Sequence, residues 1–131
     1  GSPVYYRQVQ VGQVTGYELS QSFQKVNIHI VIEEKYRSIV RKNSRFWSVS
    51  GLRFEGGLFS GLKVSTESIT SILKGGVAMA TPGEGVQQGP VQKGTRFPLF
   101  DGPKKDWLDW SPDFVLLQRE DSKKHLQYQE D

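Results

Sequence analysis

The most constraining feature of the sequence is an alternation of apolar and polar side chains over residues 26–32. Apolar residues occupy every second position there, namely Val26, Ile28, Ile30 and Ile32. A period of two is typical of a β-strand with one face on a core and one face in solvent. We therefore predict a strand whose even positions point inward. His29 falls on the outer face, where we expect a solvated side chain and no ligand role.

Similar short runs recur along the chain and favour a small, strongly curved sheet. Predicted strands cover residues 3–19, 45–49, 77–80 and 95–100. Gly12 interrupts the first of these runs, which predicts a β-bulge. Pro98 cannot donate a ladder hydrogen bond, so we expect residues 95–100 to lie at an edge of the sheet.

Two short segments change to a helical period. After Glu34, apolar residues stand at i, i+3 and i+4 (Tyr36, Ile39 and Val40), which predicts a helix that ends near Asn43. A second helix is predicted after Thr66, a good N-cap, and is expected to stop at Gly75-Gly76.

A chain of 131 residues is long enough for one domain with a sizeable core. We assign residues 1–82 to this core. Residues 83–94 are rich in glycine, lack periodicity and are predicted to be a linker. Residues 95–131 form either an extension of the domain or the start of a further repeat. The aromatic and aliphatic residues of 104–117 should pack against this domain or a neighbour. Residues 118–131 are charged and polar, and we expect them either to fray or to form a helix that needs a partner.

An apolar loop is the strongest candidate for a working site. The strand-like runs at residues 52–54 and 62–64 flank Leu58 and Phe59, and the hinges are glycines: Gly56, Gly57 and Gly61. Glycines free the backbone but bury nothing, so the two large side chains would be held away from the body. Exposed apolar surface usually marks contact with another chain, a membrane or an apolar ligand. The alternative is that both side chains fold back as a lid on the core.

Three basic residues, Arg37, Arg41 and Arg45, recur every four positions. They are candidates for contact with an anionic headgroup or with a partner's carboxylates. The competing interpretation is a solvated helix face.

Composition argues against several functional classes. The chain has no cysteine, which excludes disulfides and thiolate metal sites, and its net charge of +3 comes from basic residues scattered among acidic ones. We therefore expect no nucleic-acid partner. No motif for nucleophilic, metal-dependent or paired acid–base catalysis occurs, so we predict no enzyme, no metal and no cofactor. No apolar run approaches the roughly 18 residues of a membrane span, and no signal peptide opens the sequence.

Several short motifs occur together in a recognisable order. They are Pro3-Val4-Tyr5-Tyr6-Arg7, Val11-Gly12-Gln13-Val14, Ser44-Arg45-Phe46-Trp47, Ser50-Gly51, Gly57 to Gly61, Ile72-Leu73-Lys74-Gly75-Gly76-Val77-Ala78 and Thr81-Pro82. This set resembles the MCE (mammalian cell entry) domain, in particular the multi-repeat branch that includes paraquat-inducible protein B and its larger relatives. The resemblance covers about residues 1–100.

This resemblance implies a mainly β fold, a small seven-stranded MCE-type β-barrel with one or two short helices. The family's first strand should precede Pro3, so the barrel would be either incomplete or closed by another segment such as residues 97–100 or 114–117. Six copies would form a hexameric ring in the full-length protein. The alternative for a fragment such as this one is a monomer. Leu58 and Phe59 would line its central pore.

The resemblance also implies a cellular location and a function. The protein would be periplasmic, tethered to the inner membrane by a segment outside this sequence, and would work with an inner-membrane partner protein. Its ligand would be a phospholipid or another hydrophobic molecule moving between the inner and outer membranes. Two alternatives stay open: a protein-binding or adhesion module that uses the same apolar loop, and a hydrolase on a β scaffold.

Overall fold

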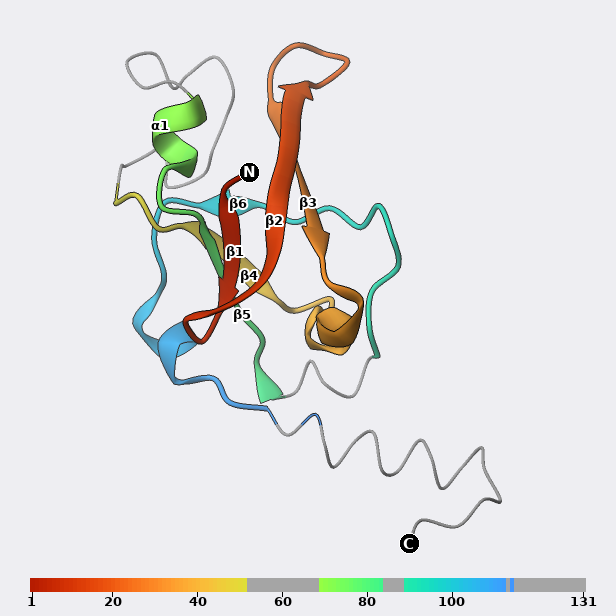
Figure 1. Cartoon of the computed structure of the whole chain (residues 1–131), viewed down its shortest axis with the longest axis vertical. Helices are drawn as coiled ribbons and strands as arrows, with labels where there is room; N and C mark the ends of the chain where they lie inside the picture. The colour runs from red at the N-terminus through yellow and green to blue at the C-terminus, as the bar shows by residue number, and fades with distance from the viewer. Residues whose placement is uncertain (52–68, 84–88, 113, 115–131) are drawn as a thin grey trace, which may run out of the picture.

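The computed structural model describes residues 1–51, 69–83, 89–112 and 114, and most of its regular structure is β. The elements in chain order are β1 Pro3–Tyr6, β2 Val9–Leu19, β3 Val26–Ile32, the 3-10 helix η1 Glu34–Ile39, β4 Arg45–Ser48, α1 Ile69–Leu73, β5 Val77–Ala80, β6 Leu99–Phe100 and the 3-10 helix η5 Lys105–Asp109 (Figure 1). The expected mainly β class with short helices is confirmed.

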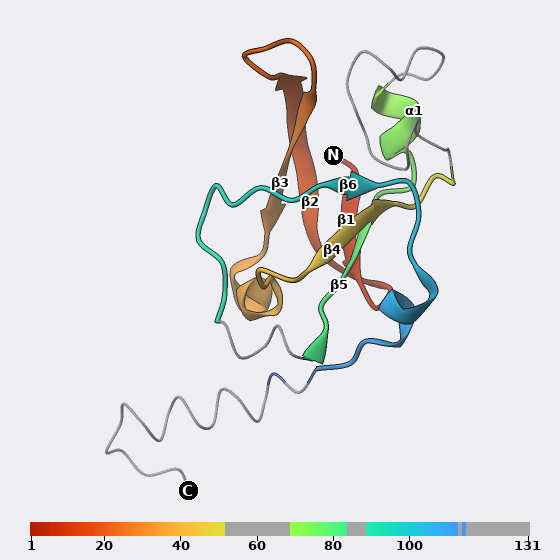
Figure 2. The same cartoon turned by 180° about the vertical axis from the view of Figure 1, so that it is seen from behind.

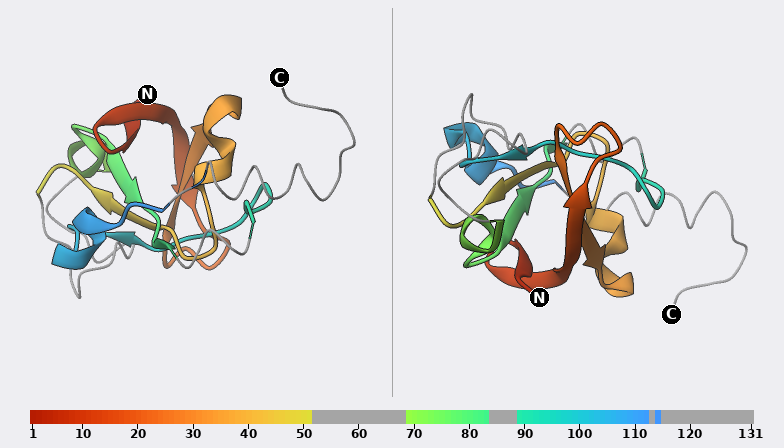
Figure 3. Two further views of the ribbon diagram at one scale, coloured as in Figure 1. Left: turned by 90° about the horizontal axis from the view of Figure 1, so that it is seen from below. Right: turned by 90° about the horizontal axis from the view of Figure 1, so that it is seen from above.

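All six described strands belong to one sheet, in the order β3-β2-β1-β5-β4-β6. The β1–β5 and β4–β6 pairs are parallel and the other pairs are antiparallel. The sheet curls into a half-barrel, as the views along its length show (Figure 3). Six strands among the described residues approximate the seven that the family resemblance implies.

Two irregularities bend β2, the longest strand. Its pairing with β1 shifts where Val4 faces Gly12 and Tyr5 faces Gln10, which leaves Val11 as an extra residue. The bulge predicted at Gly12 is therefore confirmed. A Cβ at position 12 would overlap the Val31 carbonyl oxygen, so only glycine fits there. A second shift follows Val14 in the pairing with β3, and such bulges increase the local twist.

The core lies on the concave face of the sheet. It contains Val4, Val11, Val14, Ile39, Val40, Phe46, Leu73, Val77 and Met79, with Ile28, Ile30 and Ile32 packed against it. The inward orientation predicted for the even positions of β3 is thus confirmed, and His29 is exposed as expected. Full burial of one such aliphatic side chain contributes roughly 1.5–3 kcal/mol, so this cluster dominates the stability of the domain.

A smaller aromatic cluster joins the segment after residue 97 to the β4–β5 part of the sheet. Trp107 of η5 is 5% exposed and packs on Trp47, with 5.8 Å between ring centroids. Phe97 contacts Phe46 at a centroid distance of 4.9 Å, and β6 adds the edge strand next to β4 (Figure 2). The edge position expected for residues 95–100 is confirmed, but only Leu99–Phe100 form a strand, and the residues up to Pro98 do not. The expectation that the aromatic residues after Lys104 pack is confirmed for Trp107.

Two local predictions differ from the structure. The segment predicted as a helix ending near Asn43 is a 3-10 helix that ends at Ile39, and Val40 is already extended. The run from Pro3 to Leu19 contains a hairpin turn at Arg7-Gln8, where both residues have positive φ (51° and 68°). That combination is the two-residue type I′ turn, which normally requires Asn or Gly, and neither occurs here.

Candidate functional site

The predicted apolar loop is described only at its two ends. Leu58, Phe59 and the glycine hinges Gly56, Gly57 and Gly61 lie outside the described residues. The chain leaves the described part after Gly51, just beyond β4, and re-enters it at α1. In Figure 1 both points lie at the end of the molecule toward which the β2–β3 hairpin also projects.

A buried hydrogen-bond brace joins the two ends. The Ser48 hydroxyl donates to the Ile72 carbonyl at 2.5 Å, and the Val49 amide donates to the Gly76 carbonyl at 3.0 Å. Because the Ser48 proton is already used, the Ser50 hydroxyl must donate in its 2.9 Å bond to Ser48. The segment 52–68 therefore starts and ends on a stem whose backbone is fixed.

The stem also depends on a glycine with a left-handed backbone. Gly76 has φ +104°, and a Cβ there would lie 2.5 Å from the Pro3 carbonyl oxygen. Its amide donates to the Leu73 carbonyl at 2.9 Å, which ends α1. The helix stop predicted at Gly75-Gly76 is confirmed.

The three candidate arginines do not share one face. Arg37 is exposed on η1, Arg45 is half-buried, and Arg41 is buried at 3% exposure. The Arg45 guanidinium donates to the carbonyls of Asn43 and Ser44 at 3.1 and 3.2 Å. Contact with an anionic group thus remains a prediction, to which Arg37 and Arg45 are the accessible contributors.

Arg41 points inward because the chain leaves the helical path at Val40. Its Nε donates to the Ser38 carbonyl at 2.5 Å, and its guanidinium lies 5.3 Å from the Phe114 ring centroid. Its backbone bridges to Pro90, and the Val91 amide donates to the Val40 carbonyl at 3.1 Å. A buried guanidinium held in this way serves the packing of the domain.

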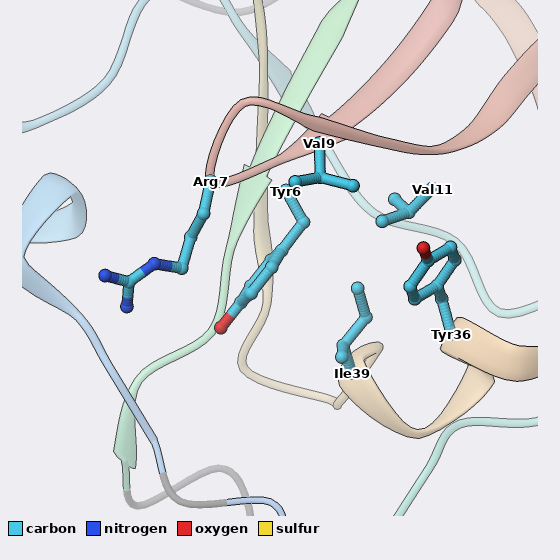
Figure 4. A pocket seen from close by; sticks show the side chains of 6 residues that line it. All are labelled: Tyr6, Arg7, Val9, Val11, Tyr36 and Ile39. Carbon is cyan, nitrogen blue, oxygen red and sulfur yellow. The ribbon is translucent and has the colours of Figure 1, made fainter.

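A second surface feature is an open apolar hollow of about 530 Å³ between the β1–β2 turn and η1. It is lined by Tyr6, Arg7, Val9, Val11, Tyr36 and Ile39 (Figure 4). In that view, the Tyr6 ring separates the aliphatic wall from the Arg7 side chain. Burial raises the pKa of the Tyr6 phenol above its ordinary value, while the Arg7 charge acts in the opposite direction.

The sequence did not point to this hollow, because its residues come from three elements and their spacing follows no motif. The unpredicted turn at Arg7-Gln8 brings Tyr6 and Val9 together as a cross-strand pair. The shortening of the helix to η1 places Tyr36 and Ile39 opposite them. The turn has a left-handed φ at two successive non-glycine residues, Arg7 and Gln8, and these residue types do not predict that conformation.

Among the residues that the structure describes, no three His, Asp or Glu side chains gather as a metal site would require. Within the same ranges, no helix has the length and apolarity needed to cross a bilayer.

Comparison with known families matches this chain to one of them. The model of the MlaD protein family matches residues 1–74, more than half of the chain. The chain belongs to the MlaD family of MCE domains. The match covers β1 to α1 and includes the loop candidate Leu58-Phe59. The resemblance noted in the sequence motifs is confirmed.

Two curated relatives extend the similarity beyond the family match. This MCE domain is 41% identical over 110 residues to a probable intermembrane transport protein of Haemophilus influenzae. It is 38% identical over 111 residues to lipophilic envelope-spanning tunnel protein B of Escherichia coli K12. Each alignment covers 84% of this chain but only 12% of the relative, so the domain corresponds to a small part of those proteins.

Proposed function

We propose that this MCE domain is one segment of a periplasmic conduit that carries phospholipid or another hydrophobic molecule between the inner and outer membranes. The main support is the similarity, at 38% and 41% identity, to relatives named as a lipophilic envelope-spanning tunnel protein and an intermembrane transport protein. No catalytic step is required, since transfer along an apolar surface makes and breaks no covalent bond.

In this proposal, copies of the domain form a hexameric ring and present Leu58 and Phe59 to a shared axis. The hydrogen bonds of Ser48 to Ile72 and of Val49 to Gly76 support it, because they hold together the described residues on either side of the loop segment. An apolar lining lowers the free energy of an acyl chain by about 25 cal/mol for each Å² kept from water. Six tips around one axis would therefore replace a water-filled pore by a continuous path for lipid tails.

The remaining parts of the proposal concern location and partners. A conduit between membranes requires a tether at the inner membrane, which we place in a segment of the full-length protein outside this chain. It also requires a donor of lipid, which we assign to an inner-membrane partner protein. Arg37 is exposed and Arg45 is half-buried, and both are the proposed contacts for an anionic headgroup or for that partner.

The test uses the full-length protein with Leu58→Asp and Phe59→Asp, singly and together. We expect loss of lipid photo-crosslinking and of lipids that co-purify in mass spectrometry, with the assembly mass unchanged. Leu108→Asp is the matched control, since Leu108 is 65% exposed on η5 and lies outside the segment that carries the loop. Unchanged crosslinking in both loop variants would contradict the proposal. A monomer that captures a defined protein without lipid would favour a protein-binding module instead.

A further inference from the structure

We propose that the open hollow between the β1–β2 turn and η1 is a second lipid site, which holds one acyl chain of an anionic phospholipid. The site is separate from Leu58 and Phe59 and lies entirely on described residues (Figure 4). The inference rests on the proposed function for the choice of a lipid as ligand, and otherwise on the shape, lining and charge of the hollow.

The wall of the hollow is apolar and partly uncovered. Val11 and Ile39 form its buried floor at 1% and 8% exposure, whereas Val9 at its edge is 52% exposed. The rings of Tyr6 and Tyr36 are half-buried and stand on either side. An uncovered aliphatic surface framed by aromatic rings is typical of small-molecule sites, and about 530 Å³ lies within their usual range of about 300–1,000 Å³.

Arg7 and Lys35 place positive charge near lining residues of the hollow, which favours an anionic headgroup. Arg7 lines the hollow beyond the Tyr6 ring, and its Nη1 donates to the Ser111 hydroxyl at 2.8 Å. Among the residues that the structure describes, no carboxylate forms a salt bridge with it, so its charge is not neutralised there. A second positive charge belongs to Lys35, whose Nζ lies 5.1 Å from the ring centroid of the lining residue Tyr36. Guanidinium groups bind phosphate well because their N–H donors match its oxygens.

The backbone that carries Arg7 is strained, which fits a binding role. Arg7 and Gln8 both have a left-handed φ without being glycine, a conformation that costs roughly 1–3 kcal/mol per residue. The turn fixes Arg7 beside the wall, since Tyr6 and Val9 pair directly across it. A phospholipid would place one chain against Val9, Val11 and Ile39 and its phosphate near Arg7.

The test is methyl NMR of the complete 131-residue chain titrated with dihexanoyl phosphatidylglycerol below its critical micelle concentration. We expect saturable shifts confined to the methyl groups of Val9, Val11 and Ile39. Val9→Asp should weaken binding about tenfold or more, because a carboxylate would be desolvated by the chain. Val31→Asp is the matched control: Val31 is also 52% exposed but lies on β3, outside the hollow, and its variant should bind normally.

The charge is tested with a second lipid and a second pair of variants. Dihexanoyl phosphatidylcholine should bind about threefold more weakly, as expected for a partly exposed ion pair. Arg7→Gln should remove this preference and keep residual binding of both lipids. Arg96→Gln, at an exposed residue away from the hollow, should leave the preference intact.

Three results would overturn the proposal: no saturable shift, shifts centred on the β2–β3 hairpin, or equal loss of binding in Val31→Asp. Nuclear Overhauser effects from Val9 methyl groups to protons beyond Phe114, undisturbed by lipid, would also overturn it, because the hollow would then be filled by the chain itself.

The proposed conduit stands if this lipid site fails but Leu58→Asp and Phe59→Asp still abolish crosslinking. Failure of those loop variants, with lipid still bound at Val9, would instead remove the conduit and keep this site.

Discussion

Ser44 and Thr81 share a buried hydroxyl–hydroxyl hydrogen bond of 2.6 Å across 37 positions of sequence. The Thr81 hydroxyl donates to the Ile39 carbonyl at 2.8 Å, so Ser44 must be the donor to Thr81. The Ser44 oxygen in turn accepts the Arg41 amide at 2.9 Å. This directed chain joins the end of η1, the start of β4 and the end of β5.

We predict that Thr81→Val destabilises the domain by about 1–3 kcal/mol. Valine keeps the shape but leaves the Ser44 proton and the Ile39 carbonyl without this partner. The control is Thr95→Val, since Thr95 is exposed and its hydroxyl donates only locally, to the Gln92 carbonyl at 2.7 Å. Urea unfolding measures both variants. A Thr81→Val variant as stable as the wild type would show that the chain of hydroxyls adds nothing net.

The loop stem gives a second prediction, based on Ser48. Ser48→Ala removes the donor to the Ile72 carbonyl, and we expect a loss of about 1 kcal/mol. We also expect faster hydrogen exchange at the Val49 amide, which bonds Gly76 beside it. Ser22→Ala, in the exposed turn between β2 and β3, should change neither quantity. Unaltered exchange at Val49 in Ser48→Ala would contradict a braced stem.

The aromatic cluster gives a third prediction. Trp107→Ala should cost about 3–5 kcal/mol, because a buried indole leaves a large cavity against Trp47 and Phe100. Leu108→Ala, at its exposed neighbour, should shift stability by less than about 0.5 kcal/mol. Urea unfolding followed by tryptophan fluorescence and by far-ultraviolet circular dichroism should give one coincident transition. Two separate transitions would indicate that residues 95–110 unfold independently of the sheet.

The Tyr6 phenol gives a prediction about pH. Burial raises its pKa in the folded state above the ordinary value of 10.0. The folded protein therefore retains this proton more tightly than the unfolded chain does. The resulting stability is complete below pH 10 and is lost as pH rises through the folded-state pKa. Tyr6→Phe should flatten the fall in stability above pH 10. If the free energy of unfolding falls in parallel with pH for Tyr6→Phe and the wild type, the raised pKa of Tyr6 is contradicted.

Much of the sheet could be predicted from sequence because its strands carry period-two patterns. The alternation from Val26 to Ile32 fixes which face of β3 meets the core, and Gly12 marks the bulge that bends β2. The helix stop at Gly75-Gly76 follows from the same local chemistry, since both residues have positive φ. In each case a local pattern or a residue type marks the feature in the sequence.

Other features depend on contacts that no local pattern encodes. The helical period after Glu34 placed Arg41 on a helix face, but the chain turns extended at Val40 and packs Arg41 against Ser38 and Phe114. Likewise, Arg7-Gln8 forms a tight turn only because the flanking strands pair. The hollow depends on both deviations, which is why the sequence did not reveal it. The assignments of residues 83–94 as a linker and 95–131 as an extension or further repeat stay predictions.

The position of β1 has a consequence for how the protein is made. β1 is synthesised before the other described strands, yet it lies in the middle of the sheet and pairs in parallel with β5, more than seventy residues later. Its neighbour on that side does not exist until Val77–Ala80 has been synthesised, and β4 likewise gains its parallel neighbour only once Leu99–Phe100 follows. At a translation rate of about 5–20 residues per second, the nascent chain spends several seconds with its central strand half-paired. That interval is when a chaperone would find the strand accessible.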